Sequence, residues 1–157
     1  MKNYWSKVKR RLDQLRQLHN LADLLLFLRL FFFAAAVPAL MRLKLPRLET
    51  LLTPRQMPPA PEQARVQKII NYTDTVLRVG RPLVRSRCLT RGLTLYYFLK
   101  RAGLQVSLWF GVASVEGQLA GHCWLVKDGE PFSEPKDPRS LYNVIYTFPS
   151  RSLRPPT

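Results

Sequence analysis

The stretch SRCLTRGLTLYYFLKRAG, residues 86–103, predicts a mostly buried helix that begins beside a cysteine. Ser86 is a suitable N-cap, and Gly103 follows a basic last turn, as is common at helix ends. Apolar residues between them recur at helical spacing over a wide stripe, which is typical of a buried helix. Cys88 then lies at the helix N-terminus, where free N–H groups and the helix dipole favour a thiolate. The same pattern also fits an inert buried cysteine that happens to begin a helix.

The composition is that of a basic chain with enough apolar residues for a core. The chain has 157 residues, sufficient for one domain or two small ones, and 46% of them are hydrophobic. The formal net charge of +15 indicates an anionic partner: a nucleic acid, an anionic membrane surface or an acidic peptide. There is no helix-turn-helix, zinc-finger or RNP pattern, so we expect no nucleic-acid partner. Two cysteines are too few for a disulfide framework and fit a reduced cytoplasmic enzyme as well as a single disulfide.

Proline placement suggests the domain organisation. Residues 1–45 form a basic and apolar helical region, in which the run LADLLLFLRLFFFAAAVPALM at 21–41 approaches the length that a bilayer needs. Arg29 and Pro38 argue against a clean span, so this run packs on protein or associates with a membrane. Five prolines within residues 46–61 disfavour helix and sheet and predict a Pro-rich linker. A core at 62–148 and a loose basic tail at 149–157 complete the predicted organisation.

On either side of the cysteine helix the hydrophobic period differs. Residues 62–79 have a helical period, whereas apolar residues alternate along 104–110 and predict a strand. Further strands are predicted at 119–127, 130–134 and 142–148, with hairpin connections at 115–118 and at Asp128-Gly129. The expected fold class is therefore α+β, with the cysteine helix packed on a small antiparallel sheet and preceded by N-terminal helices.

A histidine lies within the second predicted strand. Cysteine–histidine catalysis requires the His122 imidazole within reach of the Cys88 sulfur, and a third group that orients the ring. The nearby acids are Asp128, Glu134 and Asp137, and Glu134 is the better candidate because Asp128 already forms the turn. A two-residue loop at 128–129 would direct Glu134 away from the face of His122, whereas an odd loop or a bulge would bring it onto that face. Both registers stay open at this point.

Cys123 directly follows His122 and should therefore point to the opposite face of the strand. We interpret it as a packed residue rather than a second nucleophile or a disulfide partner. The two cysteines and two histidines also lack zinc-ligand spacing, since His19 is remote, and we expect no metal.

Taken together, these residues resemble a known family. The motifs CLTRGL at 88–93, GHCWLV at 121–126 and DG at 128–129 follow the order found in the transglutaminase-like cysteine peptidases of lasso-peptide biosynthesis, the B protein in its C-terminal-domain form. The resemblance covers residues 64–137 and implies a papain-like, transglutaminase-like core. It also implies Cys88 as nucleophile, His122 as base and Glu134 at the third position, where aspartate is usual. Gly121 and Cys123 stand where alanines are common.

The resemblance further implies a reaction and partners. Such enzymes remove the leader from a ribosomally made precursor peptide, which a small leader-recognition protein delivers and an ATP-dependent macrolactam cyclase processes next. Cleavage would need no cofactor and would occur in the cytoplasm, with residues 1–45 suited to contact a membrane surface through their basic flanks. The departures at Gly121, Cys123 and Glu134 also fit an alternative, a catalytically weak or inactive scaffold that binds the precursor or partner enzymes.

Overall fold

A computed structural model describes residues 20–80, 87–115 and 117–150 of the chain. Its helices are α2 (Leu21–Leu40), α3 (Leu45–Leu52), α4 (Gln63–Val79), α5 (Arg87–Ala102) and the short 3₁₀ helix η1 (Pro138–Ser140). Its strands are β1 (Ser107–Val115), β2 (Gln118–Lys127), β3 (Glu130–Phe132) and β4 (Asn143–Phe148). The α+β class predicted from the sequence is confirmed, as are the helix predicted at 62–79 and the four predicted strands. The N-cap Ser86, residues 1–19 and most of the predicted tail lie outside the described residues.

The four strands form one antiparallel sheet in the order β3-β2-β1-β4. Strands β1 and β2 pair along their whole length, from Ser107 opposite Val126 to Val115 opposite Gln118. Strands β2 and β3 are joined by the two-residue turn Asp128-Gly129, whose φ angles of 52° and 84° are those of a type I′ hairpin turn. Strand β3 covers only the last residues of β2, so the described part of β2 before Leu125 has no strand partner on that side.

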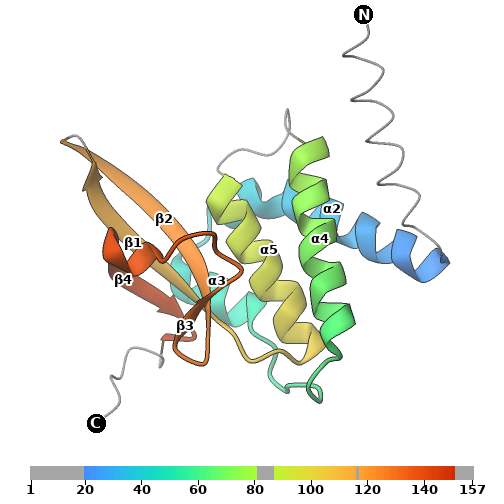
Figure 1. Cartoon of the computed structure of the whole chain (residues 1–157). Helices are drawn as coiled ribbons and strands as arrows, with labels where there is room; N and C mark the ends of the chain where they lie inside the picture. The colour runs from blue at the N-terminus through green and yellow to red at the C-terminus, as the bar shows by residue number, and fades with distance from the viewer. Residues whose placement is uncertain (1–19, 81–86, 116, 151–157) are drawn as a thin grey trace, which may run out of the picture.

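Helix α5 lies at the centre of the molecule, between the sheet on one side and α4 and α2 on the other (Figure 1). The centre of its apolar stripe is fully buried, since Leu93, Leu95, Tyr96 and Leu99 have no exposed surface, whereas Leu89, Tyr97 and Phe98 are half-buried. These side chains share one core with Leu108 of β1 and with residues of β2 and β4. The helical spacing of the cysteine stretch thus predicts its burial correctly, and Cys88 is carried at the end of a rigid element.

The predicted linker contains a helix that the proline count did not indicate. Helix α3 begins at Leu45 and places Pro46 in its first turn, where a missing N–H costs nothing. Its Leu48 and Leu52 are buried in the same core as α5, and Thr53 is hydrogen-bonded to Tyr96 at 2.7 Å. The expectation that residues 46–61 lack helix is therefore wrong, and this segment does not separate two packing units.

Helix α2 is buried along one side and exposed along the other. Leu30 and Ala34 pack against Tyr72 and Val76 of α4, and Asp23 at the start of the helix binds Lys68 Nζ at 2.8 Å. Pro38 lies inside the last turns and does not end the helix. Among the described residues, α2 is the one helix long and apolar enough to cross a membrane by length and composition, with a mean hydropathy of 2.0. The packed side shows that α2 contacts protein.

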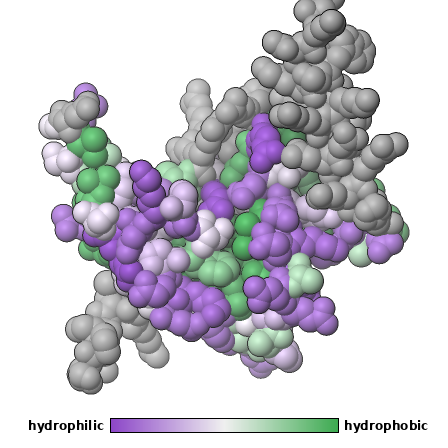
Figure 2. Space-filling view, viewed as in Figure 1, coloured by the Kyte–Doolittle hydropathy of each residue, from purple (hydrophilic) through white to green (hydrophobic). Residues whose placement is uncertain are grey.

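Polar and charged residues cover most of the described surface in the view of Figure 2. Apolar residues gather at the tip of the β1–β2 hairpin in the same view, where Leu119 is 80% exposed. The segment from β3 through η1 crosses the front of the sheet on its way to β4 (Figure 1). This crossing carries two of the three candidate acids, Glu134 and Asp137.

Candidate active site

Cys88 lies in the first turn of α5 and is partly exposed. Its pKa is lowered from 9.0 to about 5, first by a hydrogen bond with the Cys123 side chain, and then by the hydrogen bond and charge of His122 and the backbone N–H of Leu89. Burial opposes this shift without cancelling it. The site therefore holds Cys88 as a thiolate at neutral pH, which is the form that a nucleophilic cysteine requires.

His122 is placed by β2 and oriented by an aromatic cluster. Its ring stacks against Trp124 with centroids 5.9 Å apart and an interplanar angle of 20°, and lies 5.2 Å from the ring of Tyr142. Trp124 is fully buried over Gly111 on β1, where a Cβ atom would come within 2.8 Å of the indole ring. The contacts with Trp124 and Tyr142 restrict the orientation of the His122 ring, and the close packing of Trp124 leaves no space for a larger residue at position 111.

Glu134 reaches His122 in spite of the two-residue turn. Its Oε2 lies 3.7 Å from His122 Nε2, and its side chain is only 13% exposed. Strict strand alternation after this turn would direct Glu134 to the other face, as the sequence predicts for that register. Strand β3 instead ends at Phe132, and Ser133 adopts a φ of 60°, which breaks the alternation and turns Glu134 toward the histidine.

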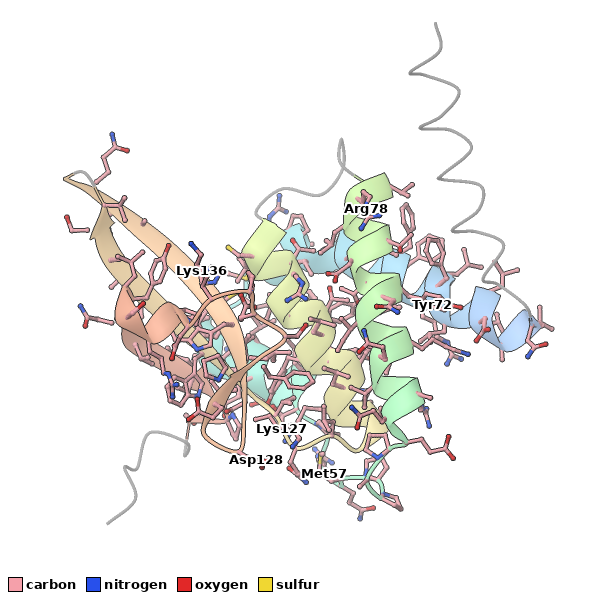
Figure 3. All side chains as sticks on the ribbon, in the orientation of Figure 1. Met57, Tyr72, Arg78, Lys127, Asp128 and Lys136 are labelled. Carbon is pink, nitrogen blue, oxygen red and sulfur yellow. The ribbon has the colours of Figure 1, made fainter. Side chains whose placement is uncertain are left out.

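The other two acids have separate contacts. Asp137 caps η1 by accepting from the Arg139 backbone N–H at 2.9 Å, and the Arg139 side chain also binds it. Asp128 pairs with Lys127 at the β2–β3 turn, which Figure 3 shows at the lower end of the sheet, away from the N-terminus of α5. The structure thus brings Cys88, His122 and Glu134 together and keeps Asp128 and Asp137 apart from them.

Arg91 connects the acid to the helix bundle. One turn after Cys88 on α5, its Nε donates to Asp74 of α4 at 2.8 Å, and its Nη1 donates to Glu134 Oε1 at 3.3 Å. It also binds the Ser133 carbonyl oxygen at 3.2 Å and the Ser133 Oγ at 3.0 Å. Burial raises the pKa of Glu134, and the charge of Arg91 acts in the opposite direction. The sequence marks Arg91 only as a nearby positive charge, because its partners are 17 to 43 residues distant along the chain.

Cys123 is the second thiol of the site. It is packed as predicted, with 2% of its surface exposed, on the face of β2 that contacts α5. Its Sγ nevertheless donates to the Cys88 carbonyl oxygen at 3.3 Å and lies within hydrogen-bonding reach of the Cys88 thiol. Alternation along β2 predicts its orientation correctly, but the approach of α5 to that face was not predictable from spacing. The contact of Cys123 with the Cys88 backbone therefore goes beyond what the sequence predicts.

The family comparison agrees with this architecture. The family model of the transglutaminase-like superfamily matches residues 27–147, which is more than half of the chain. The chain belongs to the transglutaminase-like superfamily. Neither a curated protein nor a solved structure matches it. The match begins within α2, so in this transglutaminase-like protein the matched region includes the apolar helix from residue 27 onward, together with α3, α5 and nearly all of the sheet.

Proposed function

We propose that this transglutaminase-like protein is a cysteine peptidase that removes the leader from a ribosomally made precursor peptide. The observation that carries the proposal is the lowered pKa of Cys88, about 5, at the N-terminus of a buried helix and beside a histidine. Such a thiolate–imidazole pair is the arrangement of acyl-transfer cysteine enzymes. The resemblance of the CLTRGL and GHCWLV motifs to lasso-peptide leader peptidases supplies the substrate class.

Each residue has a defined role in the proposed reaction. The Cys88 thiolate attacks the scissile carbonyl carbon, and the Cys88 backbone N–H at the start of α5 donates to the developing oxyanion. The His122 imidazolium gives its proton to the leaving amine, and water then hydrolyses the acyl-enzyme. Glu134, 3.7 Å from His122 Nε2, orients the ring and stabilises its charged form. These steps use only side chains, the backbone and water.

The test is cleavage of the precursor with the leader-recognition protein present. We expect Cys88→Ala and His122→Ala to abolish cleavage, because each removes one member of the acyl-transfer pair. Glu134→Gln should lower kcat, whereas the matched change Asp137→Asn should not, because Asp137 contacts Arg139 rather than His122. Cleavage that survives Cys88→Ala would contradict the mechanism and favour a scaffold that presents the precursor to another enzyme, such as the macrolactam cyclase.

A second candidate function is docking on an anionic membrane surface through α2. The outward side of the first three turns of α2 exposes large apolar residues, at fractions of 39–73%: Leu21, Leu24, Leu25, Leu28 and Phe32. Beside them is a groove of about 980 Å³ between α2, α4 and α5, lined by Arg29, Arg65 and Arg101 and by the ion pair of Lys68 with Asp23, so its net charge is positive. Apolar residues flanked by basic ones suit the boundary between lipid tails and anionic headgroups.

Vesicle sedimentation tests this second function. We expect the protein to sediment with vesicles containing phosphatidylglycerol and to be released by salt, and neutral vesicles should bind it weakly. The double variant Leu25→Ser/Phe32→Ser should lose this binding, whereas the control Leu119→Ser, on the β1–β2 hairpin, should keep it. Equal sedimentation of the double variant and the control would exclude α2 as the docking element, and binding of the leader-recognition protein that responds to the same variants would identify a protein partner instead.

A further inference from the structure

The contact between α5 and β2 brings two thiols of different accessibility together. Cys88 is partly exposed, and it is the more acidic thiol. Cys123 is 98% buried, and its pKa is raised by the nearby Cys88 sulfur and by burial. A peroxide in solution can therefore reach Cys88, whereas Cys123 is protected by the core.

Gly92 makes this contact possible. It lies one turn after Cys88 on α5, and a Cβ atom there would come within 2.9 Å of the Cys123 Sγ and 3.0 Å of Leu108 Cδ1. The missing side chain lets the Cys123 Sγ approach the helix backbone and reach the Cys88 carbonyl oxygen at 3.3 Å. The two thiols are also within hydrogen-bonding reach of each other. Formation of a disulfide would bring the two sulfurs from this contact to about 2.05 Å.

We propose that Cys88 is a site of reversible oxidation by hydroperoxides and that Cys123 is its resolving cysteine. The Cys88 thiolate attacks the peroxide O–O bond, takes up one oxygen as a sulfenic acid and releases the remaining oxygen as an alkoxide or hydroxide. The Cys123 sulfur then attacks the Cys88 sulfur. The S–O bond breaks, the Cys123 proton leaves with the hydroxyl group as water, and a Cys88–Cys123 disulfide forms. The two sulfurs lose two electrons in total, which reduce the peroxide.

Disulfide formation between Cys88 and Cys123 would inactivate the Cys88 nucleophile reversibly and protect it from further oxidation. A disulfide-bonded Cys88 cannot attack a carbonyl, so the protein is inactive until a thiol reductant restores both cysteines. Without a neighbouring thiol, a sulfenic acid proceeds to sulfinic and sulfonic acids, which are not restored by thiols. The contact with Cys123 thus makes the oxidation of Cys88 reversible, where it would otherwise be irreversible. The inference rests on the reactivity of Cys88 and not on the identity of the peptide substrate.

The experiment measures the oxidation state directly by mass. The full-length protein is treated with hydrogen peroxide, quenched with iodoacetamide before unfolding, and analysed intact and after digestion without reductant. Wild-type protein should lose two hydrogen atoms, yield one peptide pair linked through Cys88 and Cys123, and return to the starting mass with dithiothreitol. Cys123→Ser should instead gain oxygen at Cys88, trap dimedone there, and progress to a sulfinic acid that dithiothreitol does not reverse.

Two results would overturn the inference. One is accumulation of Cys88 sulfinic acid in the wild type as fast as in Cys123→Ser. The other is a linked peptide that appears only between molecules, in disulfide dimers. Cys123→Ala provides a second variant if serine is not tolerated in the core. The wild-type peptide map tests for the Cys88–Cys123 disulfide without any variant. Since none of these readouts uses peptide cleavage, failure of the peptidase proposal and failure of the thiol switch are distinguishable.

Discussion

The pH dependence of Cys88 alkylation tests the electrostatics of the site most directly. The perturbation is pH itself, from 4 to 10, with iodoacetamide as the probe and free cysteine as the reference thiol. Since the pKa of Cys88 is about 5, we expect its alkylation rate to rise to a plateau with a midpoint near this value. Partial burial of Cys88 lowers the absolute rate but leaves the midpoint unchanged, so the midpoint is the quantity to compare.

The expected magnitude follows from the thiolate fraction. At pH 6 a thiol with a pKa of about 5 is about 90% ionised, against about 0.1% for one with the ordinary value of 9.0, a ratio of about 900. The lower pKa also weakens the nucleophile, by about 60-fold for a Brønsted slope of about 0.45. For equal access, Cys88 should react about 15-fold faster than the ordinary thiol at pH 6. Between pH 6 and pH 9 its rate should change by only about 1.1-fold, whereas that of the ordinary thiol should rise by about 500-fold.

Peptide mapping assigns the reaction to Cys88, since Cys123 is buried and should stay unmodified in the folded protein. Two of the causes of the lowered pKa can be removed by substitution: Cys123→Ala removes the thiol hydrogen bond, and His122→Asn removes the imidazole. Both should move the midpoint upward. A wild-type midpoint near 9 would refute the thiolate at this site. A low midpoint that neither variant shifts would refute the assigned causes and leave the helix N-terminus as the source of the effect.

Three further predictions concern the surroundings of the site. Arg91→Lys keeps the charge but loses the hydrogen bonds that the planar guanidinium makes to two carboxylates. It should lower the free energy of unfolding by about 1–3 kcal/mol in a urea titration, and it should lower kcat for precursor cleavage. Gly92→Ala should cost about 1–3 kcal/mol, and Cys123→Ala in the same chain should recover part of that loss in a double-mutant cycle. Leu48→Ala should lower the free energy of unfolding by about 2–5 kcal/mol because the Leu48 side chain has no exposed surface. Leu51, on the same helix, is 53% exposed, and Leu51→Ala should change the free energy of unfolding by no more than about 0.5 kcal/mol. Equal stabilities of these last two variants would mean that α3 does not pack as described.

Local patterns predicted the elements that carry the site. The apolar stripe of residues 86–103 predicted the buried helix, the alternation at 104–110 predicted the first strand, and turn signals and β-forming residues predicted the others, because each of these patterns depends on only a few neighbouring residues. The mean proline content of residues 46–61 does not predict helix α3. The prolines there are not distributed evenly. Pro46 is the second residue of the helix and the others follow Leu52, so the eight residues of α3 contain a single proline at a tolerated position.

The position of Glu134 could not be predicted from side-chain alternation along the strands. The turn at 128–129 has two residues, and strand alternation after such a turn would direct Glu134 away from His122. The Glu134 Oε2 nevertheless lies 3.7 Å from the His122 Nε2. The difference arises at Ser133, whose positive φ is unfavourable for a residue other than glycine and must be stabilised by its surroundings. Arg91 supplies that stabilisation, because it binds both the carbonyl oxygen and the hydroxyl of Ser133 while it pairs with Glu134. One side chain on the cysteine helix thus holds the backbone conformation that brings the acid to the histidine. The geometry proposed for catalysis therefore depends on a contact between α5 and the end of β3, which no local pattern in the sequence contains.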